Sequence, residues 1–249
     1  MASNSILFIT GANTGLGFET IKALCHSSTA YTILLGGRNL QKAKTAAEAA
    51  RREFPESRSI ITPVQIDIED DDSIREVFDR SQLDQQFKNG TMSMRDMWNK
   101  SWSVNTTGTF ILTHTFVPLL LKAVDPRLLF ITSGTSTLAE SGNTALPVNK
   151  PLAKGWPKQS LGIPAYRSAK TGMNMMMRQW VRILGEDGVK VWCISPGYLA
   201  TGLGGSLEMN KKMGAQDPTI GAHFIRDVVE GARDQDVGKV IRKNDIQPW

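Results

Sequence analysis

Thr10-Gly11-Ala12-Asn13-Thr14-Gly15-Leu16-Gly17 is the stretch that decides the fold. It follows an apolar run at residues 6–10, and Phe18, Ile21 and Leu24 then recur at helical spacing, which predicts a strand, a tight turn and a helix. One glycine permits the turn, another lets the backbone approach a pyrophosphate, and the last lets the helix pack on the strand. An ordinary turn uses the same residue types, but the strand and helix on either side favour a dinucleotide site.

The rest of the chain continues this alternation. The patterns predict further strands at residues 31–35, 60–68, 127–133, 189–194 and 239–241, and further helices at residues 40–54, 94–122, 165–184 and 218–229. Pro118 is expected to kink or end the second of these helices. The alternation implies parallel strands joined by crossovers, hence a doubly wound α/β sheet in a single domain spanning residues 1–249. Residues 135–164 are rich in Ser, Gly, Pro and Asn and too long for an ordinary connection, so a functional loop is predicted there.

Composition limits the classes of function. No window approaches the roughly 18 uninterrupted apolar residues of a membrane helix, and the N-terminus is too polar and short for a secretory signal. A cytoplasmic protein without a membrane partner is therefore expected. The net charge is +5, but Lys and Arg are scattered, so nucleic acid is not an expected partner. Cys25 and Cys193 lie far apart among apolar neighbours, which favours buried thiols and predicts neither a disulfide nor a metal site.

The residues after the second and third strands bear on the choice of dinucleotide. Gly36, Gly37 and Arg38 follow the second strand, where an acidic residue would repel a 2′-phosphate. A guanidinium can bind that phosphate in bidentate fashion, so NADP(H) is predicted and NAD is less favoured; the alternative is that Arg38 is a surface charge. Asp67 ends the third strand, and it either accepts a hydrogen bond from the adenine amino group or caps the segment that follows.

Tyr166-Arg167-Ser168-Ala169-Lys170 opens a predicted helix and carries the candidate proton-transfer pair. A spacing of four residues places Tyr166 and Lys170 on one face of the helix. A nearby ammonium stabilises a tyrosinate, so the pair can move a proton to or from a substrate oxygen. The spacing alone is common, and its meaning depends on the other motifs.

Together these motifs resemble the short-chain dehydrogenase/reductase family over nearly the whole chain. Residues 10–17 match its TGxxxGxG loop, Val104-Asn105 its helix asparagine, Ile131-Thr132-Ser133 its catalytic-serine strand and residues 166–170 its YxxxK motif. Ser195-Pro196-Gly197 with Thr201 resembles its PGxxxT segment beside the nicotinamide.

The resemblance implies roles for these positions. Tyr166 would be the general acid or base, and Lys170 would stabilise the tyrosinate and hold the nicotinamide ribose. Ser133 would bind the substrate oxygen, although Ser136 competes for this role, and Asn105 would hold the water that connects Lys170 to solvent. Taken singly, Ser133 could instead cap its strand and Asn105 could satisfy helix backbone.

The cofactor and substrate assignments follow from the same resemblance. Gly11, Asn13, Thr14, Gly15, Leu16 and Gly17 would cradle the phosphates, with Pro196, Gly197, Leu199 and Thr201 at the nicotinamide end. The implied enzyme is an NADP(H)-dependent oxidoreductase of ketones or secondary alcohols, assembled as a homodimer or homotetramer. Residues 135–164 would shape the substrate pocket. The apolar residues there and after Gly197 predict a hydrophobic small molecule; they include Leu138, Leu146, Leu152, Trp156, Leu161 and Leu203.

One part of the family pattern is absent. Residues 79–100 contain neither the apolar central strand nor the NNAG motif that the family has before its helix asparagine, and Asn89-Gly90 is only a faint echo. Loss of the central strand would leave backbone groups unpaired in the middle of the sheet. Either an internal segment is missing from this chain, or the deletion is real, or residues 82–87 fill the gap. A real deletion predicts weak cofactor binding and low stability, and with them the alternative function of a catalytically impaired relative that serves binding or assembly.

Overall fold

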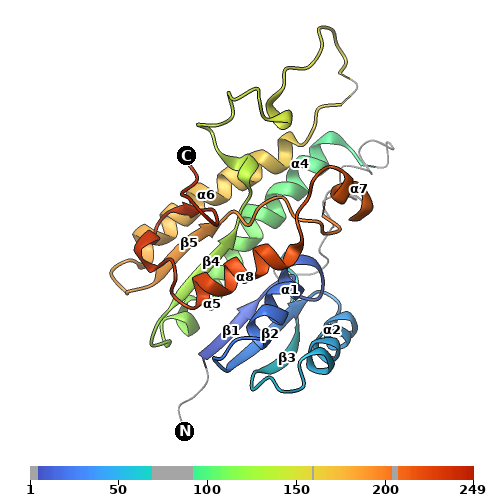
Figure 1. Cartoon of the computed structure of the whole chain (residues 1–249). Coiled ribbons are helices and arrows are strands. Elements are labelled where there is room, and N and C mark those ends of the chain that lie inside the picture. The colour runs from blue at the N-terminus through green and yellow to red at the C-terminus, as the bar shows by residue number, and fades with distance from the viewer. Residues whose placement is uncertain (1–4, 69–91, 159, 204–206) are drawn as a thin grey trace.

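The computed structural model describes residues 5–68, 92–158, 160–203 and 207–249. Its N-terminal part is a sheet of three parallel strands, β1 (Ser5–Ile9), β2 (Tyr31–Gly37) and β3 (Ile60–Gln65), with β2 in the middle (Figure 1). Helices α1 (Gly15–Cys25) and α2 (Leu40–Glu53) connect the strands. Their apolar stripes pack on the sheet in one core that includes Ile21, Leu24, Ile33, Leu35, Ala43, Ala47 and Ala50, all fully buried.

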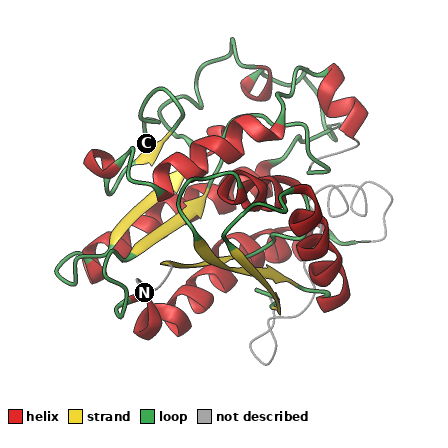
Figure 2. Cartoon of the chain, turned by 60° about the horizontal axis from the view of Figure 1, so that its bottom comes forward, coloured by secondary structure: helices red, strands yellow, loops and turns green. Residues whose placement is uncertain are grey.

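The C-terminal part is a second sheet of three parallel strands. β4 (Arg127–Ile131), β5 (Lys190–Ile194) and β6 (Val240–Ile241) lie in that order. The long helix α6 (Pro164–Leu184) buries its methionine-rich stripe on one face, and α8 (Pro218–Val229) covers the other face. Figure 2 shows helices on both sides of the strands. The predicted doubly wound α/β architecture is confirmed.

The segment between the sheets differs from its prediction. The sequence favours one helix over residues 94–122, whereas the structure has α4 (Met94–Trp102), a π-helical turn (Ser103–Thr107) and α5 (Gly108–Leu120). The expected break at Pro118 is only partly right, because the proline lies inside α5 and the helix ends two residues later. The larger irregularity is the π turn, and such turns concentrate at functional sites.

The predicted functional loop carries little regular structure. Within residues 135–158 and 160–163, it contains only the end of one 3₁₀ turn (Gly134–Ser136) and another such turn (Pro147–Asn149). Figure 1 shows the loop extending from the top of the molecule beyond α6. The short helix α7 (Leu207–Lys212) was not predicted, because six residues are too few to show a periodic apolar pattern.

The two sheets do not join among the described residues. There β1 pairs only with β2, and β4 only with β5. Ile6 on β1 is 69% exposed, whereas the middle of a doubly wound sheet is normally buried on both faces. The stretch in which the sequence pattern lacks a central strand, residues 79–100, is described only from residue 92 onward, so the lack of that strand stays a prediction. Residues 82–87 and Asn89-Gly90, considered above as substitutes, lie outside the described residues.

Other expectations can be compared directly with the structure. Cys25 and Cys193 are both buried, as predicted, and burial raises the pKa of each thiol. Over the described ranges, no helix is both long enough and apolar enough to cross a bilayer. In the same residues, no cluster of three or more His, Cys, Asp or Glu side chains is arranged to hold a metal ion.

A charge cluster holds the starts of β4 and β5 to the turn before β6. Asp234 accepts two hydrogen bonds from Arg127, at 2.6 and 2.9 Å, and one from Lys190 at 2.6 Å. The Arg127 hydrogen bonds are the main reason that the pKa of Asp234 is lowered to about 2. Since the folded carboxyl has the lower pKa, its stabilising contribution is complete above the ordinary aspartate pKa of about 3.9 and is lost as pH falls towards 2.

We expect Asp234→Asn to destabilise the fold at pH 6 and to have a smaller effect at pH 3. At the lower pH the wild-type carboxylate is already losing its advantage over the neutral side chain. Urea denaturation midpoints of both proteins at the two pH values measure this difference. An equal loss at pH 6 and pH 3 would contradict the assignment.

Candidate active site

The phosphate loop between β1 and α1 has the geometry of an anion cradle. Gly15 has a φ of +57°, a left-handed conformation that favours glycine. A Cβ on Gly17 would lie 2.5 Å from the carbonyl oxygen of Gly11, so only glycine lets α1 pack this closely on the loop. Within the described residues, no side chain caps the first turn of α1, and that turn contains no acidic residue. Its amides therefore point to where a phosphate would bind.

The adenosine side of the site comes together at the carboxyl ends of the three strands. The amide of Ala12 donates to Gly36 O at 2.9 Å, which joins the loop to the end of β2. Arg38 follows β2 and is half-buried, and Asp67, two residues beyond β3, is 2% exposed. The structure thus places both predicted adenosine-side residues at the edge where the phosphate loop lies.

The segment after β5 reaches the same loop from the other sheet. Thr201 approaches within 3.8 Å of the position that a Cβ on Gly15 would occupy, and Leu199 and Pro196 pack against Gly221 of α8. Of the predicted nicotinamide-side residues, Thr201 is therefore adjacent to the phosphate loop.

Asn210 of α7 holds this segment in place, and sequence reasoning missed it. The side chain is 1% exposed, and its Nδ2 donates to Thr201 O at 2.8 Å and to Leu203 O at 3.1 Å. The hydroxyl of Tyr198 donates to Asn210 Oδ1 at 3.1 Å. These bonds join a short helix that no sequence pattern indicated to the segment that precedes it, so the sequence carries no local signal for them.

Tyr166 and Lys170 lie in the first turns of α6, which begins at Pro164. The ammonium of Lys170 is 5.8 Å from the ring centroid of Tyr166, and the Lys170 residue is 9% exposed. Lys170 Nζ donates to Ile131 O at 2.6 Å, at the last residue of β4. The pair therefore lies beside the turn that contains Ser133, two residues further along the chain.

The structure separates the two candidate serines. Ser136 is 2% exposed, and its hydroxyl donates to Ser133 O at 2.6 Å while accepting from Asn174 Nδ2 at 2.9 Å. The Ser136 hydroxyl is therefore buried and hydrogen-bonded to other protein groups. Ser133 is half-buried, and its Oγ lies 2.9 Å from Thr135 Oγ1 and accepts from the Thr135 amide. Ser133 also caps the 3₁₀ turn after β4, whereas the alternative interpretation had it cap the strand itself.

Asn105 lies in the middle of the π turn. Its Nδ2 donates to Ser101 O at 2.9 Å, so the side chain does satisfy helix backbone, as the simpler interpretation held. The neighbouring Thr106 donates from Oγ1 to Ala169 O at 3.0 Å, which places the π turn against α6 one residue before Lys170. The hydrogen bond to Ser101 O bears out the simpler interpretation, and the role of Asn105 in holding a water stays a prediction.

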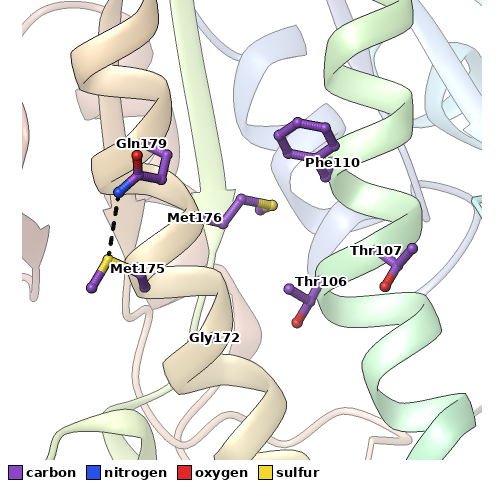
Figure 3. A pocket seen from close by; sticks show the side chains of 7 residues that line it. All are labelled: Thr106, Thr107, Phe110, Gly172, Met175, Met176 and Gln179. Carbon is purple, nitrogen blue, oxygen red and sulfur yellow. Dashed lines mark hydrogen bonds between the residues drawn. The ribbon is translucent and has the colours of Figure 1, made fainter.

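A separate apolar groove of about 420 Å³ lies between α5 and α6 (Figure 3). None of the predicted catalytic residues lines it. Its lining consists of Thr106, Thr107, Phe110, Gly172, Met175, Met176 and Gln179. Phe110 stacks on Trp180 with the ring centroids 5.0 Å apart, while 39% of Phe110 and 63% of Met175 remain exposed.

Comparison with known proteins identifies the family. Residues 5–146 and 155–212 match the sequence pattern of the short chain dehydrogenase family. The chain belongs to this family. This short-chain dehydrogenase is 43% identical over 270 residues to the short-chain dehydrogenase/reductase eupG of Phoma sp, with 98% of this chain and 97% of the relative covered. It is 40% identical over 264 residues to the short-chain dehydrogenase/reductase tropE of Talaromyces stipitatus, with 100% and 99% covered.

The lengths of these alignments differ from the length of this chain. The Phoma alignment covers 270 positions, whereas this short-chain dehydrogenase has 249 residues, so the relative contains internal residues that this chain lacks. The Talaromyces alignment, at 264 positions, gives the same result. Both relatives therefore contain internal residues that this chain lacks.

Solved structures agree with the fold. The NADPH-bound carbonyl reductase from chicken fatty liver has a TM-score of 0.71 and 17% identity, with both chains covered completely. Carbonyl reductase Sniffer of D. melanogaster has a TM-score of 0.70 and 18% identity, with 99% of each chain covered. Members of this family use nicotinamide cofactors and act on small molecules, and the protein is accordingly an oxidoreductase.

Proposed function

We propose that this short-chain dehydrogenase transfers hydride between NADP(H) and a ketone or secondary alcohol, with Tyr166 as the proton-transfer residue. The observation that carries the proposal is the Lys170 Nζ hydrogen bond to Ile131 O, which joins the Tyr166–Lys170 helix to the turn of Ser133. Reduction of a carbonyl requires a proton donor beside the oxygen, and this group of residues provides one.

The phosphate loop fits a dinucleotide, and we assign the cofactor to it. Gly15 makes a left-handed turn and Gly17 lets α1 pack on the loop, so the uncapped start of α1 can face a pyrophosphate. Arg38 lies where the 2′-phosphate of NADP(H) would be bound, and the chicken carbonyl reductase of the same fold is described as NADPH-bound. Leu199 and Thr201 are assigned to the carboxamide end. When bound, the nicotinamide supplies or accepts the hydride.

The protein's own residues then manage the substrate oxygen. Tyr166 donates a proton to that oxygen during reduction and removes it during oxidation. The positive charge of Lys170 stabilises the tyrosinate left behind, and the hydroxyl of Ser133 holds the same oxygen by a hydrogen bond. Asn105 is assigned to hold the water through which Lys170 exchanges protons with solvent.

Changing Arg38 tests the cofactor assignment. We expect Arg38→Ala to weaken NADPH binding by about 10- to 100-fold, because charge-assisted hydrogen bonds to the 2′-phosphate contribute about 1.5–3 kcal/mol. NADH binding should change by less than about threefold, since NADH lacks this phosphate. Fluorescence titrations with both cofactors measure the difference, with Arg52→Ala on the exposed face of α2 as a matched control. An equal loss for NADPH and NADH would show that Arg38 acts on something other than the phosphate.

We assign residues 135–164 to the substrate pocket, and Arg167 supports this by joining the loop to α6. Its guanidinium donates to Thr135 O at 3.0 Å, to Val148 O at 3.2 Å and to Asn149 Oδ1 at 2.8 Å. The loop residues Leu152 and Trp156 are 53% and 79% exposed. Side chains of this kind suit a hydrophobic small-molecule substrate.

The chain is proposed to act as one domain in the cytoplasm and to assemble into a homodimer or homotetramer. The groove between α5 and α6, with the exposed Phe110 and Met175, supports assembly, because apolar surface of this kind is favourably buried against another copy. Sedimentation velocity of the full chain tests this, and a monomer at micromolar concentration would contradict it.

A second function has an observation in its favour. Among the described residues, β1 and β4 each pair with one strand only, which suits a catalytically impaired relative that serves binding or assembly. Absence of NADPH and NADH binding in the titrations above would favour this alternative, and turnover with a panel of carbonyl compounds would eliminate it.

A further inference from the structure

A buried polar network lies behind the turn of Ser133. Its four side chains come from the turn after β4, from α6, and from the segment that follows β6. Buried polar groups of this kind are costly unless each donor and acceptor is paired, so such a network holds its members in fixed positions. The members are Thr132, Ser136, Asn174 and Gln247, which are 4%, 2%, 4% and 1% exposed.

Gln247 reaches into this network from the C-terminal segment. Its Nε2 donates to Ser133 O and to Ser136 Oγ, at 3.2 Å each. Its own amide donates to Val240 O at 2.9 Å, which attaches it to β6, and its Oε1 accepts from Arg242 at 3.4 Å. One side chain thus links β6 to the carbonyl of the proposed substrate-binding serine.

Asn174 links the same turn to the catalytic helix. It lies one helical turn after Lys170, donates to Ser136 Oγ at 2.9 Å and accepts from Thr132 Oγ1 at 2.6 Å. Ser136 in turn donates to Ser133 O at 2.6 Å. The carbonyl oxygen of Ser133 therefore accepts from two donors, the Ser136 hydroxyl and the side-chain Nε2 of Gln247.

The segment around Gln247 is itself held against the turn, and Figure 1 shows the C-terminus beside the start of the long loop. The amide of Ala139 donates to Trp249 O, and the guanidinium of Arg178 lies 5.9 Å from the Trp249 ring centroid. Arg242 forms a bidentate ion pair with Glu140. Gln247 is therefore well placed to act as a fixed support.

We propose that Gln247 is a positioning residue for the reaction and acts through Ser133. Two hydrogen bonds to the Ser133 carbonyl fix the orientation of that peptide group, and with it the direction in which the Ser133 hydroxyl points. Catalytic groups lose much of their effect when displaced by about 1 Å, so a support behind the serine matters for turnover. This inference rests on the proposed function of Ser133.

A double-mutant cycle on turnover tests the proposal. Gln247→Met keeps the length of the side chain and removes both donated hydrogen bonds, and we expect kcat to fall by about 10- to 100-fold with little change in the KM for NADPH. In a Ser133→Ala background the same change should alter kcat by less than about twofold, because the group through which Gln247 acts is gone. Gln235→Met, on an exposed glutamine, is the matched control. Equal losses in both backgrounds would overturn the proposal.

Amide hydrogen exchange gives a readout that does not need turnover. We expect Gln247→Met, and separately Ser136→Ala, to speed exchange at Thr135 and Ser136 by at least about tenfold relative to wild type, with the amides of α1 and α2 unchanged. If the wild-type chain has no turnover, the proposed function fails, but the exchange result still decides whether Gln247 holds the turn. Unchanged exchange in Gln247→Met would overturn the proposal. Faster exchange at the Thr135 and Ser136 amides in both variants would support it.

Discussion

Tyr166→Phe is expected to lower kcat/KM by about 10²- to 10⁴-fold, the usual contribution of a positioned general acid or base. At 1.36 kcal/mol per tenfold change, this corresponds to about 2.7–5.4 kcal/mol of transition-state stabilisation. The substitution removes one hydroxyl and keeps the ring, whose centroid lies 5.8 Å from Lys170 Nζ, so the fold should be little affected. NADPH oxidation with a confirmed carbonyl substrate measures the loss.

Tyr31→Phe is a matched control for this experiment. Tyr31 is 4% exposed and its hydroxyl donates to Glu230 Oε1 at 3.3 Å, so Tyr31→Phe also removes a single tyrosine hydroxyl, but on β2 and away from α6. We expect its kcat/KM to stay within about threefold of wild type, since no reacting group is touched. If Tyr166→Phe retained full turnover while Lys170 was intact, Tyr166 would not be the proton donor.

The alternation of strands and helices could be predicted because each element carries its own periodic pattern. α6 has polar and apolar faces and α8 begins at Pro218 after a capping aspartate, so their bounds were found almost to the residue. β2 and β5 are short apolar runs bounded by polar or glycine-containing segments. In such segments, the local preference for helix or strand agrees with the pattern of burial, so the sequence is sufficient to predict the element.

The π turn could not be predicted in the same way. A Cβ on Gly108 would lie 1.6 Å from the carbonyl oxygen of Ile68, so the start of α5 is set by the chain that leaves β3. This contact joins residues 40 positions apart in the sequence. A helical repeat of apolar residues therefore gives no sign of it. The sequence pattern located Asn105 but had no means to show that its helix is widened there.

The candidate site was found through motifs, whereas its supports were not. Ser133, Tyr166 and Lys170 stand in recognisable spacings, but the bonds that hold them involve Asn174 and Gln247. Asn174 did carry a signal, because it is a polar residue on the buried stripe of α6 beside Met173 and Met177. Gln247 carried none, since its contacts depend on how the segment after β6 folds back over the turn.

Restoring the central strand is expected to have the largest effect on stability. Among the described residues, β1 and β4 each have one edge without a strand partner, and the relatives contain internal residues that this chain lacks. A strand inserted there would pair on both edges and cover apolar side chains such as Ile6. We expect a gain of about 3 kcal/mol or more, which raises the midpoint of thermal unfolding by roughly 6–12 °C for a domain of this size.

The experiment is a chimera in which the segment between β3 and α4 is replaced by the corresponding segment of the Phoma relative. A second chimera with a Gly/Ser-rich segment of equal length is the control, because it adds residues without adding a strand. We expect only the first to raise the unfolding midpoint and to strengthen NADPH binding by at least about tenfold, since the strand would support the phosphate loop from β1. If neither property changed, the two sheets would be sufficient as they stand, and the gap would give no reason to regard the protein as impaired.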